Sequence, residues 1–193
     1  MTFEAGFLRQ GEFPNFSWQN ERLMTTNGKI VPAENYFLKP GYIYLSVKPT
    51  VISTVLGSSV SVCLYDRKRK VGGMNHFKLP AIADPKKSTA EYGNIATLTL
   101  IRMMLEDGSK RKHIEAQIFG GAHRPDVSET DMGSDNVRVA RKVLARERLQ
   151  IVSEDVGGRK GRKIVFDTSK NEIAIIKVEK IRGGDWYPYE DDR

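Results

Sequence analysis

Apolar and polar residues alternate in short runs through the middle of the chain, and this is the period of strands with one buried face. The pattern predicts strands over residues 42–47, 51–56, 59–65, 71–79, 114–119, 149–153, 162–167 and 173–178. Residues 66–70 are polar and form a turn between two of these runs. We therefore expect the strands on either side of that turn to pair as a hairpin.

Two longer segments repeat apolar residues every three or four positions, which is the period of an amphipathic helix. The first covers residues 89–106 and ends before Asp107-Gly108, and the second covers 136–148 after the capping pair Ser134-Asp135. In the first helix the residues at this spacing are Ile95, Leu98, Ile101, Arg102 and Leu105. In the second helix the predicted inner face is Val137, Ala140, Val143 and Leu144.

Strand pairs combined with two helices predict an α/β fold, a single-domain layered sandwich of mixed β-sheets with two main helices. A length of 193 residues suits one domain. Residues 1–40 lack a sustained period, so we expect an N-terminal extension or wrap. The predicted domain covers residues 41–180, and residues 181–193 form an irregular tail.

Composition narrows the possible classes of protein. No apolar run approaches the roughly 20 residues that span a bilayer, so no membrane insertion is expected. The N-terminus shows no secretory signal, and we expect a cytoplasmic protein. Cys63 is the single cysteine, which excludes an intrachain disulfide and a cysteine-rich zinc site. We predict no metal and no cofactor.

The net charge of +7 and a pI near 9.5 favour encounters with acidic partners. The basic residues gather at 67–70, 110–112 and 159–163. No helix-turn-helix, RNA-recognition or zinc-finger spacing accompanies them, so no nucleic-acid partner is predicted. We interpret most of these lysines and arginines as a solvated surface.

Candidate chemistry lies where the run VLGSSVSVCLYD breaks at a glycine and continues as a strand. His76 follows Ser59 by seventeen positions, on the strand expected to pair with the one that Ser59 begins. That hairpin can bring an imidazole and a hydroxyl within hydrogen-bonding distance, as nucleophilic catalysis requires. A buried histidine whose nitrogens are satisfied by backbone groups is the structural alternative.

Further motifs occur in order along the chain: LGSSVSVCLYD, GGMNHFKLP, IFGGAH, GSDNVRVAR and EDVGGRKGRKIVFDT. From about residue 36 to 178 the sequence resembles the CheD family of chemoreceptor glutamine deamidases. The resemblance implies an α/β sandwich that hydrolyses glutamine side-chain amides on methyl-accepting chemotaxis receptors and releases ammonia. It also implies binding to CheC, a phosphatase of the response regulator.

The family mechanism implies three site residues, and two of them are assigned by motif. The histidine of GGMNHF is His76, which would accept and return the proton of the nucleophile. The hydroxyl that orients this histidine falls on Ser53 or Thr54. Ser53 is favoured by its position six residues before the nucleophile, whereas Thr54 is favoured by its residue type.

The nucleophile departs from the family pattern, because the family motif LGSC reads LGSS here and Ser59 occupies the cysteine position. Cys63 lies four residues further along the strand, about 13 Å away at about 3.3 Å per residue, and cannot replace it. Three explanations stay open. The chain has lost amidase activity and kept its binding roles, it carries an introduced cysteine-to-serine change, or it is a slow serine amidase or esterase.

The resemblance also implies residues that contact substrate around this corner: Gly57, Ser58, Asn75, Gly120 and Gly121. Backbone N–H groups at 57–59 offer an anion pocket. The glycine-bounded segment 155–162 has two interpretations, a tight turn between strands or a loop that docks the receptor. The predicted partners are thus chemotaxis receptors and a CheC-type phosphatase.

Overall fold

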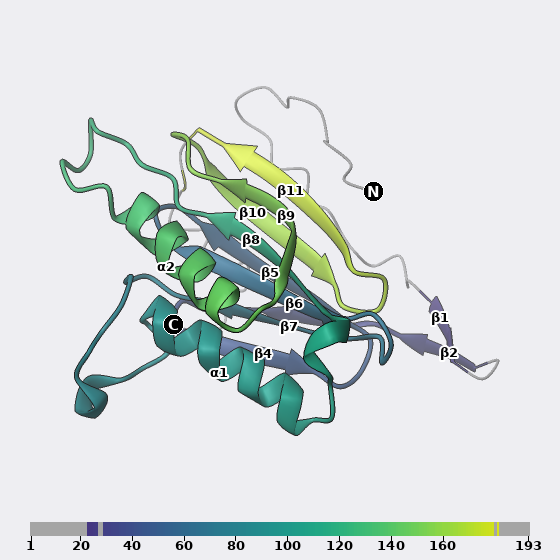
Figure 1. The fold of residues 1–193 in the computed structure, drawn as a ribbon. Helices are drawn as coiled ribbons and strands as arrows, with labels where there is room; N and C mark the ends of the chain where they lie inside the picture. The colour runs from purple at the N-terminus through teal and green to yellow at the C-terminus, as the bar shows by residue number, and fades with distance from the viewer. Residues whose placement is uncertain (1–22, 27–28, 180, 182–193) are drawn as a thin grey trace.

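Two β-sheets pack face to face, and two helices cover the outer face of one of them, as Figure 1 shows. The computed structural model describes residues 23–26, 29–179 and 181. Of the predicted extension and tail, residues 1–22 and 182–193 lie outside the described residues. The predicted single-domain α/β sandwich of mixed sheets is confirmed.

The sheet under the helices has five strands in the order β4-β7-β6-β8-β9. Their bounds are β4 Tyr42–Ser46, β7 Val71–His76, β6 Val60–Asp66, β8 Ile114–Gly120 and β9 Gln150–Val156. β6 and β7 form the predicted antiparallel hairpin. β8 and β9 are parallel, and α2 connects them as parallel neighbours require. β6 is buried along its whole length because it is the central strand.

The second sheet has four strands in the order β11-β10-β5-β3. Their bounds are β11 Glu172–Val178, β10 Gly161–Asp167, β5 Thr50–Leu56 and β3 Glu34–Phe37. β3 pairs with β5 in parallel, and Leu38 after it is fully buried. Residues 34–38, which the sequence pattern groups with the extension, therefore belong to the sandwich. β1 Leu23–Thr26 and β2 Lys29–Pro32 form a separate hairpin.

Both main helices start at residues other than those expected. Helix α1 covers Gly93–Glu106 and so starts four residues later than predicted. The residues before it stay extended, because the backbone N–H groups of Lys78 and Leu79 donate to the Glu91 carbonyl. Helix α2 covers Met132–Arg146, four residues longer at its start than predicted. Its cap is the Asp131 side chain, which accepts a hydrogen bond from the Ser134 N–H. Short 3-10 turns cover Pro85–Lys87 and Arg111–His113.

The inner face of α2 is confirmed, whereas that of α1 is rotated from the prediction. The buried side chains of α1 centre on Ala96, Thr97, Leu100, Ile101 and Met104. Of the predicted face, Ile95, Leu98 and Leu105 are half-buried and Arg102 is exposed. Helix α1 is apolar on most of its circumference, so the spacing of its apolar residues does not identify one face.

Two apolar layers result from this arrangement. One lies between the helices and the five-stranded sheet and includes Val62, Leu64, Leu100 and Leu144. The other lies between the two sheets and includes Ile52, Leu56, Met74 and Phe166. Side chains of β6 and β7 alternate between these layers, as the period of a strand requires. No helix in the described part of the chain is both long and apolar enough to cross a membrane.

Gly73 allows α1 and β4 to approach β7 closely. A Cβ atom there would lie 2.9 Å from the Tyr44 carbonyl oxygen and 2.8 Å from Leu100 Cδ1. We expect Gly73→Ala to lower the free energy of unfolding by about 1–3 kcal/mol, measured by urea denaturation. Gly57→Ala is the control, because its Cβ would meet only Ile181 Cδ1, at 3.5 Å. Equal effects of the two substitutions would contradict the packing argument.

Candidate active site

Three side chains from both sheets form a continuous hydrogen-bonded chain. Thr54 lies on β5, His76 ends β7, and Ser59 immediately precedes β6. His76 Nε2 lies 2.9 Å from Ser59 Oγ, and His76 Nδ1 lies 2.8 Å from Thr54 Oγ1. All three side chains are buried, with His76 and Thr54 fully inaccessible and Ser59 6% exposed. The structure thus brings together the predicted nucleophile, the predicted histidine and one of the two candidate hydroxyl residues.

The direction of each hydrogen bond follows from the Thr54 hydroxyl. Thr54 Oγ1 donates its only proton to the Leu38 carbonyl oxygen, 2.8 Å away. It must therefore accept from His76 Nδ1–H, and a proton on Nδ1 leaves Nε2 as an acceptor. Ser59 Oγ–H then donates to Nε2. This tautomer is the one that a histidine needs in order to take a proton from a nucleophile.

Alternation along β5 decides between the two candidate hydroxyl residues. Ile52, Thr54 and Leu56 are fully buried and face the layer between the sheets. Ser53 is half-buried and, one residue away, points to the opposite face of its sheet. The preference for Ser53 by its distance from the nucleophile therefore does not agree with the geometry, because the hydroxyl beside His76 is that of Thr54.

Burial sets the charge state of the histidine. The pKa of His76 is lowered from 6.5 to about 4, mainly by loss of hydration. A hydrogen bond to the Leu38 carbonyl opposes this effect, and the Lys78 charge adds to it. The imidazole is consequently neutral at pH 7. A neutral imidazole is able to accept a proton, whereas an imidazolium is not.

Glycines let the 120–122 segment approach the Ser59 turn closely. The Gly121 N–H donates to the Ser59 carbonyl and the Ala122 N–H donates to the Gly57 carbonyl, both at 2.8 Å. Gly120 has φ +110°, and a Cβ atom there would lie 2.2 Å from the Ser59 carbonyl oxygen. Only glycine fits at Gly120. Three of the residues predicted to contact substrate, Gly57, Gly120 and Gly121, thus lie beside Ser59.

The other two predicted contact residues occupy different environments. The Ser58 side chain is exposed, and its carbonyl accepts a hydrogen bond from Asn136 Nδ2. Asn75 precedes His76 on β7 and so points to the opposite face, toward α1. There it is fully buried, accepts from the Val62 N–H and contacts Thr97 Oγ1 at 3.3 Å. Asn75 therefore lies apart from the Ser59 side chain and joins β6 to α1.

Cys63 lies on the inter-sheet side of β6, opposite Met74 rather than His76. Its side chain is buried, and burial raises the pKa of its thiol. Such a thiol stays protonated and unreactive. The structure therefore places Cys63 in the core and apart from the His76 ring nitrogens.

The segment before β4 supplies groups that the sequence pattern did not reveal. Leu38 contributes the carbonyl that accepts the Thr54 proton, and the Gly41 N–H donates to the His76 carbonyl at 2.7 Å. Tyr42 is the cross-strand neighbour of His76 and is 58% exposed. Pro40-Gly41 in the sequence marks a turn before a strand. That turn was the available signal that this segment folds back on the histidine.

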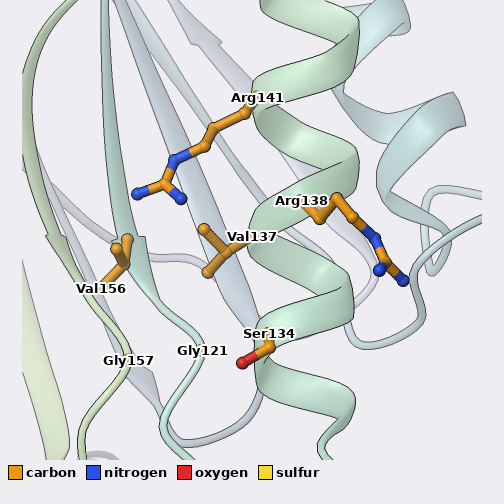
Figure 2. A pocket seen from close by; sticks show the side chains of 7 residues that line it. All are labelled: Gly121, Ser134, Val137, Arg138, Arg141, Val156 and Gly157. Atoms are coloured by element: carbon orange, nitrogen blue, oxygen red, sulfur yellow. The ribbon is translucent and has the colours of Figure 1, made fainter.

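A pocket of about 240 Å³ opens between α2 and the ends of β8 and β9, as Figure 2 shows. Its lining residues are Gly121, Ser134, Val137, Arg138, Arg141, Val156 and Gly157. Arg141 reaches toward Val156, and Arg138 points to the other side of the helix. The Arg141 guanidinium already holds both oxygens of Glu154, at 3.0 and 2.7 Å. We assign no ligand to this pocket.

In the described part of the chain, no three His, Cys, Asp or Glu side chains lie close enough together to hold a metal ion. His123 lies 3.8 Å from Asp131, as a single pair. The site around Ser59 is made of hydroxyls, an imidazole and backbone groups. Such a donor set suits proton transfer and nucleophilic attack rather than metal binding.

Comparison with known proteins identifies the family. The family described as "CheD chemotactic sensory transduction" matches residues 79–177. The chain belongs to the CheD family. A relative from Sulfurimonas denitrificans, named "Probable chemoreceptor glutamine deamidase CheD", is 36% identical over 150 residues, covering 76% of this chain and 96% of the relative.

Two further CheD relatives have similar coverage. One from Trichlorobacter lovleyi with the same name is 40% identical over 146 residues, covering 75% of this chain and 91% of its own length. The "Probable chemoreceptor glutamine deamidase CheD 2" of Shewanella oneidensis is 44% identical over 153 residues. The matched region covers 72% of this chain and 75% of the relative. The family match begins at residue 79, after Thr54, Ser59 and His76. The arrangement of those three side chains is therefore an observation independent of that match.

The lowered pKa of His76 predicts a pH-dependent stability. Protons bind more tightly to His76 in the unfolded chain, so stability falls as the pH drops from about 6.5 to about 4, by about 3 kcal/mol in total. His76→Asn removes this contribution. We expect the difference in unfolding free energy between the two proteins to shrink steadily over that pH range in urea titrations. A difference that stays constant with pH would contradict the burial argument.

Proposed function

We propose that this protein is a glutamine side-chain amide hydrolase acting on chemoreceptors, with Ser59 in place of the family's nucleophilic cysteine. The observation that carries the proposal is the chain of hydrogen bonds from Ser59 through His76 to Thr54. Membership of the CheD family supplies the class of substrate. The CheD relatives bear the name of chemoreceptor glutamine deamidases, which agrees with this assignment.

The reaction follows from the protonation states at the site. Ser59 Oγ attacks the amide carbon of a glutamine side chain while His76 Nε2 takes its proton. The protonated histidine gives that proton to the departing nitrogen, and ammonia leaves an ester on Ser59. A water molecule, deprotonated by His76, cleaves the ester and leaves glutamate. The net change is one amide and one water converted to one carboxylate and one ammonium ion.

Backbone groups of the turn are the candidates for stabilising the oxyanion. The carbonyls of Gly57 and Ser59 point to the 121–122 segment, where they accept hydrogen bonds. We assign the N–H groups of the turn over 57–59, which carries the attacking oxygen, as the donors. Such donors act on the charge that develops on the amide oxygen during attack.

Serine makes this site a weak catalyst. A hydroxyl holds its proton much more tightly than a thiol with a pKa near 8.5. Thr54 is neutral, so it orients the imidazole and gives little stabilisation to an imidazolium. Burial of His76 disfavours the imidazolium as well. These observations favour a second candidate function, a CheD-like binding module that is slow or inactive as an enzyme.

Both candidate functions involve binding to the same partners. The receptor segments that carry the target glutamines are cytoplasmic helices, so we propose a cytoplasmic location. A CheC-type phosphatase is the proposed second partner. Binding of either partner requires no chemistry at Ser59, so a serine form retains this role.

Ammonia release by the unchanged protein above that by Ser59→Ala separates the two candidate functions, and restoring the thiol tests whether the site can hydrolyse the amide. We expect Ser59→Cys to release ammonia from a chemoreceptor cytoplasmic fragment at least 100-fold faster than the unchanged protein. The physical reason is that thiol and imidazole exchange a proton far more readily than hydroxyl and imidazole. The measurement is ammonia release, with mass spectrometry locating each glutamine converted to glutamate.

The controls are Ser59→Ala and the double variant Ser59→Cys with His76→Asn, both expected to be silent. Activity in the double variant would remove His76 from the mechanism. Silence of Ser59→Cys on receptor fragments to which the protein binds would overturn the hydrolase proposal and leave the binding module.

The third residue is tested in the Ser59→Cys background. Thr54→Val keeps the shape and removes the hydroxyl that orients His76, so we expect kcat to fall about 10- to 100-fold. Thr54→Ser keeps the hydroxyl and most of the activity. Ser53→Ala is the matched control, because its side chain lies on the other face of β5, and it leaves kcat unchanged. A larger loss for Ser53→Ala than for Thr54→Val would reverse the assignment.

A further inference from the structure

A buried arginine lies behind the turn that carries Ser59. Arg162 on β10 is the cross-strand partner of Leu56, the last residue of β5 before that turn. Its side chain is only 2% exposed. Burial lowers the pKa of this guanidinium, and a buried charge of this kind is retained where polar groups surround it. The partners of Arg162 therefore indicate what the charge does.

All of those partners lie at the end of β9 or in the connection between β9 and β10. The guanidinium donates to the carbonyl oxygens of Asp155 and Gly157 and, at 2.7 Å, to the Asp155 carboxylate. A longer bond of 3.4 Å reaches the Lys160 carbonyl. A planar guanidinium can bind several acceptors at once, which an ammonium group does less well. The carbonyls of the 155–160 loop thus turn inward toward Arg162.

The same loop is hydrogen-bonded to the segment that holds Ser59. The Gly157 N–H donates to the Gly120 carbonyl at 2.9 Å. Gly121, which follows Gly120, donates its N–H to the Ser59 carbonyl at 2.8 Å. Two more backbone hydrogen bonds, each 2.8 Å, connect the same segments. The His123 N–H donates to the Gly158 carbonyl, and the Ala122 N–H donates to the Gly57 carbonyl. Three segments distant in sequence therefore form one stack, and Arg162 fixes the outermost of them.

We infer that Arg162 is a positioning residue for the nucleophile. By holding the 155–160 loop, it holds the 120–122 segment, which in turn fixes the backbone of Ser59 with its Oγ 2.9 Å from His76 Nε2. This inference rests on the proposed function for its catalytic meaning. The geometric part, that Arg162 restrains the Ser59 turn, stands without it. The glycine-bounded loop thereby serves as a support for the site.

Hydrogen exchange of the unchanged chain and of Arg162→Met tests the geometric part. We expect the backbone N–H groups of Gly121 and Ala122 to exchange at least tenfold faster in the variant. The N–H of Ala96, bonded to the Tyr92 carbonyl at 2.8 Å in helix α1, is the reference and keeps its rate. An equal increase at Ala96 would mean a general loss of stability and would overturn the inference.

Activity tests the catalytic part in the Ser59→Cys background. There, Arg162→Met should lower kcat at least tenfold while KM changes less than threefold, because the placement of the nucleophile against His76 acts in the chemical step rather than in receptor binding. Arg162→Lys keeps the charge with fewer donors and should give an intermediate kcat. The same exchange and activity comparisons made with Arg162→Lys decide the question if the methionine variant does not fold.

Lys177→Met is the matched control. Lys177 contacts the same Asp155 carboxylate at 2.8 Å but is half-exposed and bonds to no carbonyl of the loop. We expect it to change the exchange rates and kcat less than twofold. Unchanged exchange at Gly121 and Ala122 in the Arg162 variants would overturn the inference. Absence of ammonia release by Ser59→Cys itself would overturn the proposed function, and the exchange rates would still decide the role of Arg162.

Discussion

The site depends on polar side chains that meet inside an apolar layer. Thr54 from one sheet and His76 from the other are both excluded from water, so each must find its hydrogen bonds in the protein. The Leu38 carbonyl completes the set, because it accepts the one proton that Thr54 donates. This requirement fixes the imidazole tautomer and the relative placement of the two sheets together. The chemistry of Ser59 is set by how the sandwich packs.

Local pattern was sufficient to predict the part of the site that a hairpin forms. Alternation through β6 and β7 predicted their pairing, and that pairing places His76 beside the start of the strand that Ser59 precedes. The strands from β4 onward, the α/β class and the inner face of α2 followed from period in the same way, whereas β1, β2 and β3 fall in the stretch predicted as an extension. In each of these cases the residues that interact belong to one element or to neighbours joined by a short turn.

The period of apolar and polar residues did not predict contacts between elements that are distant in the sequence. The Gly57-Ser58 turn interrupts the alternation, so counting residues back from Ser59 does not tell which of Ser53 and Thr54 faces His76. Only the packing of β5 against the other sheet decides this. The face of α1 is ambiguous because apolar residues cover most of the helix circumference. The role of Arg162 depends on three loops that meet only in the folded protein.

The stack that supports Ser59 has a consequence for biosynthesis. About a hundred residues separate Ser59 from Arg162, and the parallel pair β8 and β9 between them can form only after α2 has been made. Contacts of such long range close late in folding. A chain emerging from the ribosome therefore carries its serine and its histidine long before the contacts that hold them together can form. An incomplete or truncated chain has the side chains of the site without the segments that position them.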